Sequence, residues 1–307
     1  MAVQKIEYRG WKCVRLANRR IEVVVTLDVG PRVIRFGFIG GKNEFKEYPT
    51  MMGKKGGAQW RIYGGHRLWH APEDPVRTYC PDNSPVDVEP IRHGVRVIQD
   101  VEKATGIQKE MDICLHPKKD WVTVIHRLRN TALFAVELAP WALSVMAPGG
   151  TCVIPLPPRG EHPRDLLPCN TLTMWPYTDM SDPRWTWGQK YILLRQESDP
   201  RKAKPQKIGA WVPDGWAAYA NGGSLFVKSW HPICDARYPD MGCCFETFTN
   251  QDMLEVETVG PLVSMSKGDD FEHLEHWHLF DGVPVPENDR DVDRNIRPKI
   301  KPGGCCR

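Results

Sequence analysis

The chain has 307 residues, of which 41% are hydrophobic and 26% are charged, a composition typical of a folded globular protein. This length is enough for one large β domain, or two smaller ones, with a sizeable core. The formal net charge of +3 is too small to indicate a nucleic-acid or anionic-membrane partner. No basic run alternates with aromatic residues, as a single-strand binder would require.

Two further features bear on the compartment. The first residues contain no apolar signal-like stretch, and no apolar run reaches the roughly 18 residues of a membrane span. The 10 cysteines stand singly or as the vicinal pairs Cys243-Cys244 and Cys305-Cys306, without a CxxC spacing. We therefore expect a cytoplasmic protein with free thiols and no structural zinc site.

Strand-like segments dominate the first half of the chain. They are rich in β-branched residues, and short turns such as Asp28–Pro31 and Ala104–Gly106 separate them. The predicted strands are Ile21–Leu27, Arg32–Phe38, Val95–Ile98, Ile107–Ile113 and Trp121–Leu128. Because no helical pattern lies between them, the sequence predicts an antiparallel all-β architecture, with βαβ units excluded.

The segment Gly64–Glu73, GGHRLWHAPE, concentrates polar and aromatic side chains. Its glycines would let the backbone approach a ligand closely, and Pro72 argues against a helix. A sugar requires hydrogen-bonding groups along its edge and an apolar platform for its C–H face. The alternative is a surface turn with an Arg–Glu ion pair. The candidate site residues here are His66, Arg67, Trp69, His70 and Glu73.

Residues 149–168 are rich in proline and glycine and are predicted to form an extended loop. The next segment, 172–188, alternates aromatic with charged residues, as carbohydrate-binding clefts do. An equally open alternative is a structural loop that the indoles hold together, in which Arg184 only forms an ion pair. The candidate sugar-binding residues are Trp175, Tyr177, Asp179 and Arg184.

Two strands, Phe245–Asn250 and Leu254–Thr258, are predicted around a polar turn. Alternation places Glu255 and Glu257 on one face of the second strand and the apolar residues on the other. Burying two unpaired carboxylates together would cost several kcal/mol. This face is therefore either solvated or part of a pocket that needs a carboxylate, and Glu246 on the first strand is a further binding candidate.

Near the end of the chain, the predicted strand Glu272–Phe280 carries three histidines. A metal site and a solvated histidine face are both open, although no HExxH pattern is present. Pro284–Arg307 is proline-rich and charged, and is expected to be a tail that is mobile or wrapped over the surface. The chain contains no GxGxxG motif before a helix, no P-loop and no GxSxG motif. We expect no cofactor and no metal.

Several of these motifs resemble the galactose mutarotase (aldose 1-epimerase) superfamily. Thr247–Asn250 resembles its V-Y-T-x-N strand, and Val256–Thr258 resembles the C-L-E-T-Q strand that carries its catalytic base. GGHRLWxAPE and ETxGPL resemble an uncharacterised branch, and the likeness spans roughly Ile21 to Phe280. The resemblance implies one antiparallel β-sandwich domain, a supersandwich, over residues 1–283, with Glu257 as the base.

One position departs from the family pattern. The strand Leu138–Met146 resembles the one that supplies the general-acid histidine, but Ser144 or a neighbour stands there and no histidine is present. Serine does not titrate near neutrality and cannot replace imidazole as an acid. His66 and His70 are the remaining candidates for a catalytic acid.

The resemblance therefore implies a protein that binds a small-molecule sugar or glycan and interconverts anomers by acid–base catalysis. Two alternatives stay open, a non-catalytic sugar-binding module and a lyase- or hydrolase-like enzyme acting on a larger glycan. No nucleic-acid or membrane partner is expected, and the oligomeric state is not predicted.

Overall fold

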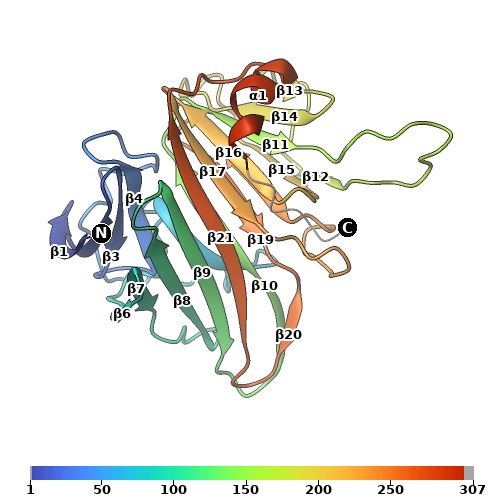
Figure 1. The fold of residues 1–307 in the computed structure, drawn as a ribbon. Helices are drawn as coiled ribbons and strands as arrows, with labels where there is room; N and C mark the ends of the chain where they lie inside the picture. The colour runs from blue at the N-terminus through green and yellow to red at the C-terminus, as the bar shows by residue number, and fades with distance from the viewer. Residues whose placement is uncertain (1, 301–307) are drawn as a thin grey trace.

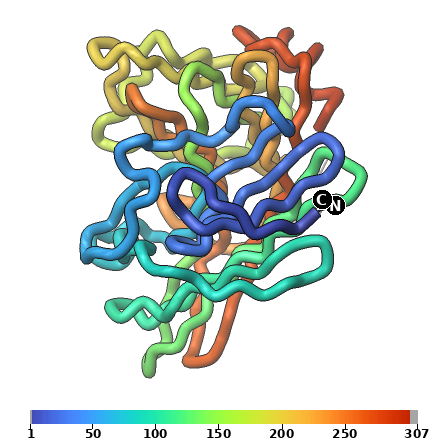
Figure 2. The backbone as a smooth tube through the Cα atoms, turned by 90° about the vertical axis from the view of Figure 1, so that its left-hand side faces the viewer, coloured from blue at the N-terminus to red at the C-terminus, as the bar shows by residue number. Residues whose placement is uncertain are grey.

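The computed structural model describes residues 2–300. Two large sheets lie face to face, and every strand pair within them is antiparallel (Figure 1). Figure 2 shows the N-terminal strands, in dark blue, on the side of the molecule that faces the viewer. The predicted all-β sandwich is confirmed.

The first sheet has 11 strands. Its order is β1-β2-β3-β4-β5-β10-β19-β18-β15-β12, with β20 pairing with one end of β10. The strands are β1 (Ala2–Tyr8), β2 (Trp11–Ala17), β3 (Ile21–Thr26), β4 (Arg32–Phe38), β5 (Gly65–Ala71), β10 (Val136–Met146), β12 (Leu172–Met174), β15 (Gln206–Ala210), β18 (Phe245–Thr249), β19 (Leu254–Val259) and β20 (Val263–Met265).

The second sheet has 10 strands in the order β13-β14-β11-β16-β17-β21-β9-β8-β7-β6. The strands are β6 (Asp87–Ile91), β7 (Gly94–Ile98), β8 (Ile107–Leu115), β9 (Trp121–Asn130), β11 (Thr151–Pro155), β13 (Trp185–Trp187), β14 (Tyr191–Arg195), β16 (Trp216–Asn221), β17 (Ser224–Trp230) and β21 (Asp270–Asp281).

The main core lies between the two sheets. Leu254 and Val256 of β19 belong to the same buried cluster as Val124 of β9 and Trp277 of β21. Because side chains alternate along a strand, Glu255 and Glu257 of β19 must face away from the second sheet. The predicted division of this strand into an apolar and a carboxylate face is confirmed.

The largest difference from the predicted elements is β5. The sequence analysis predicted a binding segment at GGHRLWHAPE, with a surface turn as the alternative, and no strand, whereas Gly65–Ala71 is a central strand in which every residue is buried. Both of its faces carry polar side chains, so it shows no alternation of apolar and polar residues. Three short strands, β11, β12 and β13, likewise occupy stretches for which only loops were predicted.

A long excursion, residues 156–171, connects β11 to β12 and projects from the body of the sandwich (Figure 1). Leu166 and Leu167 on it are largely exposed. This stretch agrees with the predicted extended loop.

The segment after β21 is more ordered than the sequence predicted. It contains α1 (Asp289–Asn295) and the 3₁₀ turn η1 (Arg297–Lys299). The side chain of Asn288 caps α1 by accepting hydrogen bonds from two backbone amides. This cap stabilises the helix, although the helix shows no apolar periodicity. Val292 and Ile296 pack against the second sheet, so residues 289–300 wrap over the surface. The predicted tail from 301 onward lies outside the described residues.

The cysteines partly contradict the prediction of free thiols. Cys234 is disulfide-bonded. Seven described cysteines are free, as predicted, and they include the buried vicinal pair Cys243 and Cys244. Among residues 2–300, no helix is long and apolar enough to cross a membrane.

Candidate functional site

Five adjacent strands of the first sheet, β5, β10, β19, β18 and β15, bring the candidate residues together. Residues directly opposite each other in an antiparallel pair point to the same face. Arg67 is opposite Leu143, Leu143 is opposite Glu257, and Glu257 is opposite Glu246. A parallel row holds Glu255, Phe248 and Lys207. The register therefore builds one polar surface from four segments that are distant in the sequence.

A pocket of about 280 Å³ lies over this surface. Aromatic rings form most of its wall, and Trp69 and Trp141 belong to an apolar cluster that is separate from the main core. The lining residues are Trp60, Ile62, Arg67, Trp69, Glu73, Tyr79, Trp141, Leu143, Tyr177, Lys207, Phe248, Asn250, Met253, Glu255 and Glu257. The pocket thus combines apolar walls with a few charged groups, as small-molecule sites do.

Glu257 lies at the base of the pocket and is 0% exposed. Its Oε2 accepts a hydrogen bond of 2.8 Å from Nε1 of Trp141, and Nζ of Lys207 is 3.8 Å from the same oxygen. Its Oε1 is buried without a hydrogen-bond partner among the described residues. An ionised carboxylate normally accepts several hydrogen bonds. This environment therefore favours the neutral acid, or a ligand that completes the shell.

Lys207 connects Glu257 to Glu246. Its Nζ is 2.8 Å from Oε2 of Glu246 and lies over the rings of Trp141 and Trp175, at 4.6 and 4.4 Å from their centres. Burial raises the pKa of Glu257 to about 8 and that of Glu246 to about 7, although the ammonium opposes both shifts. One cation compensates one of two buried carboxylates, so the pair tends to retain a proton near neutral pH.

Arg67 and Glu255 form the second charged pair in the pocket. Nη2 of Arg67 donates a hydrogen bond of 3.0 Å to Oε1 of Glu255, and both side chains are more than nine-tenths buried. The guanidinium lies 4.2 Å from the ring centre of Trp69. Its Nε and Nη1 have no hydrogen-bond partner among the described residues. Arg67 is therefore the counterion of Glu255 and still offers donors.

The buried polar atoms of the pocket that have no hydrogen-bond partner among the described residues indicate what kind of ligand it can bind. Oε1 of Glu257 is an acceptor, or a donor when protonated, while Nε1 of Trp60 and two nitrogens of Arg67 are donors. Buried polar atoms are normally paired, so these atoms indicate a ligand with both donors and acceptors. The aromatic wall suits a ligand that also has an apolar face.

The structure brings most of the predicted site residues together. Arg67, Trp69, Glu73, Tyr177, Glu255 and Glu257 all line the pocket. Trp175 and Glu246 contact Lys207 without being among the lining residues.

Two predicted binding residues lie elsewhere. Asp179 accepts hydrogen bonds from Ser181. Arg184 is buried and is paired with Asp182, which corresponds to the structural alternative that the sequence analysis left open. Neither residue is among those that line the pocket.

His66 and His70, the candidate acids, also lie away from the pocket. Alternation along β5 places them on the opposite face from Arg67 and Trp69. Nε2 of His70 is 3.6 Å from Glu102, which in turn pairs with Lys109. Ser144 is on the same hidden face, 2.9 Å from Nδ1 of His66. The residue of β10 that faces the pocket beside Glu257 is Leu143, so neither histidine nor Ser144 reaches this pocket as an acid.

His66 belongs to a polar network between the sheets. Its Nε2 is 2.7 Å from Nε2 of His126, whose Nδ1 is 2.9 Å from the carbonyl oxygen of His273. Burial lowers the pKa of both rings, so both are neutral. Since a carbonyl only accepts, His126 then carries its proton on Nδ1 and accepts at Nε2 the hydrogen bond that His66 donates.

His66, His126 and Glu275 are close enough to hold a metal ion. However, Nζ of Lys228 lies 3.0 Å from Oε1 of Glu275, and Nε1 of Trp277 donates a hydrogen bond of 2.7 Å to Oε2. The carboxylate thus already has a counterion and hydrogen bonds. This geometry favours a structural role for the three side chains.

The sequence analysis missed Lys207, Trp141, Tyr79 and Trp60. Lys207 and Trp141 enter the pocket only through the register of β15 and β10 with neighbours that are remote in the sequence. If β5 had been predicted as a strand, the alternation of its side chains would have placed Arg67 and Trp69 on one face and the two histidines of this strand on the other.

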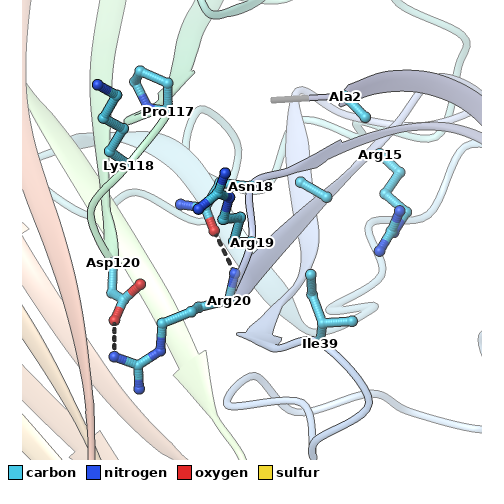
Figure 3. Close-up of a pocket in the computed structure, with 10 residues that line it drawn as sticks. Ala2, Arg15, Asn18, Arg19, Arg20, Ile39, Pro117, Lys118 and Asp120 are labelled. Atoms are coloured by element: carbon cyan, nitrogen blue, oxygen red, sulfur yellow. Dashed lines mark hydrogen bonds and ion pairs between the residues drawn. The ribbon is translucent and has the colours of Figure 1, made fainter.

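A larger hollow, of about 1000 Å³, lies beside the turn between β2 and β3 (Figure 3). Two of its three arginines already have partners, since Arg20 pairs with Asp120 at 2.9 Å and Arg15 pairs with Glu22 at 2.6 Å. It has no buried carboxyl group comparable to Glu257 among its lining residues. The smaller, aromatic pocket is therefore the candidate site.

Comparison with solved structures gives the fold. A galactose mutarotase-like protein from Lactobacillus casei matches with a TM-score of 0.53 and 9% identity, over 87% of this chain and 100% of that chain. A putative aldose 1-epimerase from Klebsiella pneumoniae matches with a TM-score of 0.59 and 10% identity, over 91% of this chain and 83% of that chain. The chain therefore has the galactose mutarotase-like fold.

A TPR-domain-containing protein from Parabacteroides distasonis matches with a TM-score of 0.56 and 14% identity, over 93% of this chain. This chain spans about half, 51%, of that protein. No protein-family model matches the sequence, and no curated protein matches it. The comparisons therefore establish the fold alone.

Proposed function

We propose that this chain, which has the galactose mutarotase-like fold, binds a single sugar ring in the aromatic pocket and interconverts its anomers. The observation that carries the proposal is the buried Glu257 carboxyl group, whose Oε1 lacks a partner at the base of a pocket walled by tryptophans. The names of the structural neighbours point to the same chemistry.

Anomer exchange requires one group that removes the proton of the anomeric hydroxyl and another that protonates the ring oxygen. The ring then opens to an aldehyde and closes on either face. Because each group regains its original protonation state on closing, Glu257 acts as a base in one half of the cycle and as an acid in the other. Glu257 therefore remains the central proton-transfer residue.

The size of the pocket supports a single ring over a longer glycan. The volume of about 280 Å³ is just below the range that small-molecule pockets have, roughly 300–1,000 Å³. This supports a monosaccharide substrate in preference to a lyase- or hydrolase-like activity on a polymer.

A second candidate function is sugar binding without catalysis. Leu143 faces the pocket beside Glu257, and no histidine is among the described residues that line it. An imidazole acid is thus missing, although two further carboxyl groups, Glu73 and Glu255, are present.

One experiment separates the two functions. Binding of a panel of aldoses is followed by tryptophan fluorescence, because Trp60, Trp69 and Trp141 line the pocket. Anomer exchange is followed by polarimetry from freshly dissolved α-anomers. A sugar that is bound and whose mutarotation is accelerated supports the epimerase. Binding without acceleration supports the non-catalytic alternative, and the absence of both contradicts the proposal.

A further inference from the structure

The pocket contains a second carboxyl group in a position to act with Glu257. Glu255 is two residues earlier on β19 and points to the same face. Two residues along a strand separate the Cα atoms by roughly 7 Å. Both side chains line the pocket, so a sugar hemiacetal can lie between them.

The two carboxyl groups have opposite environments. Glu255 accepts a charge-assisted hydrogen bond of 3.0 Å from the guanidinium of Arg67. Glu257 has one hydrogen-bond donor, Trp141, and its nearest cation is 3.8 Å away and already 2.8 Å from Glu246. A carboxylate base and a carboxylic acid on one strand form the kind of pair that acid–base catalysis requires.

We infer that Glu255 is the second proton-transfer residue, starting as the base while Glu257 starts as the acid. This inference rests on the proposed anomer exchange. A carboxyl group, in place of an imidazole, is then the second proton-transfer group.

The proton balance closes over one cycle. Glu255 takes the proton from the anomeric hydroxyl, and the O–H electron pair forms the aldehyde C=O bond. The bond between the anomeric carbon and the ring oxygen breaks, and that oxygen takes the proton of Glu257. Rotation about the adjacent C–C bond presents the other face of the aldehyde. Closing reverses both transfers and restores the starting protonation of both residues.

Lys207 and Tyr79 are less suited than Glu255 to take the proton of the anomeric hydroxyl. Nζ of Lys207 is held by Glu246, and burial together with Glu73 raises the pKa of the Tyr79 hydroxyl, which donates a hydrogen bond to Glu73. Lys207 instead lies where it can stabilise the carboxylate that Glu257 becomes after it donates its proton.

The test compares Glu255→Gln with the wild type by fluorescence titration and by NMR anomer exchange. We expect exchange to fall by about two to four orders of magnitude while the dissociation constant changes far less. Glu137→Gln is the matched control, because Glu137 is a half-exposed residue of β10 that pairs with Arg237. This control should exchange anomers at the wild-type rate.

A smaller variant separates catalysis from structure. Glu255→Ala leaves space for a small carboxylate, and added formate should restore part of the exchange by replacing the missing base. Rescue by a series of small carboxylates should rise with their basicity if they replace a base, whereas an anion that only restores the ion pair with Arg67 would show no such dependence.

Two results would overturn the inference. If Glu255→Gln exchanges anomers at the wild-type rate, Glu255 is not a proton-transfer residue, while the proposed function stands. If the wild type binds sugars but exchanges none of them, the proposed exchange and this inference both fall.

Discussion

Nε1 of Trp141 donates a hydrogen bond of 2.8 Å to Oε2 of Glu257, and this is the one hydrogen bond that the carboxyl group receives from the described residues. Trp141 and Glu257 lie on neighbouring strands, β10 and β19, in a register that also places Leu143 opposite Glu257. Burial and the neighbouring charges of Glu255 and Glu246 raise the pKa of Glu257, and Lys207 lowers it. The indole hydrogen bond also stabilises the charged form.

The first prediction concerns Trp141→Phe. The indole hydrogen bond stabilises the charged form of Glu257, so its removal should raise the pKa of Glu257 further above its present value of about 8. If Glu257 starts as the acid, wild-type exchange should decline as the pH rises through about 8. The decline should occur at higher pH in Trp141→Phe. Rate–pH profiles of anomer exchange measure both, and a shift to lower pH would contradict the assignment.

The second prediction concerns stability. Between the pKa of an unfolded glutamate, near 4.5, and about 8, the unfolded chain loses a proton that folded Glu257 retains. A raised folded pKa therefore costs stability as the pH rises through this window, by up to about 1.4 kcal/mol per pH unit. Glu257→Gln does not titrate, so its stability relative to the wild type should increase from pH 5 to pH 8. Urea unfolding at these pH values measures the difference. A constant difference would mean that Glu257 has an ordinary pKa.

The third prediction concerns Lys207→Met. Removing one partner of a buried ion pair costs about 3–5 kcal/mol because it leaves an uncompensated charge. Glu246 and Glu257 can avoid this charge by retaining their protons at low pH. The destabilisation should therefore be larger at pH 8 than at pH 5. Adding Glu246→Gln to Lys207→Met should recover part of the lost stability, and failure to do so would show that the two side chains are not energetically coupled.

The fourth prediction concerns the histidines between the sheets. Burial lowers the pKa of His273 to about 3, and its Nε2 is 2.7 Å from the hydroxyl of Thr258. Below the unfolded pKa, near 6.5, the unfolded chain binds a proton that folded His273 does not. Stability should therefore fall as the pH drops from about 6.5 towards 3.

His273→Gln keeps a donor for Thr258 but removes the titration. The loss of stability between pH 6.5 and pH 4.5 should be smaller in this variant, by up to about 1.4 kcal/mol per pH unit. Equal losses in the two proteins would contradict the buried, neutral state of His273.

How far the sequence could predict this molecule depends on the range of the interactions. The alternation in Leu254–Thr258 was enough to predict that Glu255 and Glu257 share a face, because period two is a local property. Similarly, the dense strands and the absence of helical patterns were enough to predict an antiparallel all-β architecture. The family resemblance supplied the sandwich type, which the structural comparisons confirm as a fold.

The sequence could not predict the parts of the site that depend on register. β5 is buried on both faces, so its polar residues appeared to be one cluster although the strand divides them between a pocket and the interior. Lys207 reaches Glu246 only because β15 pairs with β18, and 34 residues separate the two strands in the sequence. The short helix α1 likewise depends on a cap and on packing against the second sheet.

The most direct test of the central claim is two-dimensional NMR exchange spectroscopy on a sugar that the protein binds. The account predicts exchange cross-peaks between the α- and β-anomers with wild-type protein, and their loss with Glu257→Gln, which should still bind the sugar. A 1,5-anhydro analogue, which lacks the anomeric hydroxyl, should bind but show no exchange. Cross-peaks of equal intensity with wild type and Glu257→Gln would contradict the account.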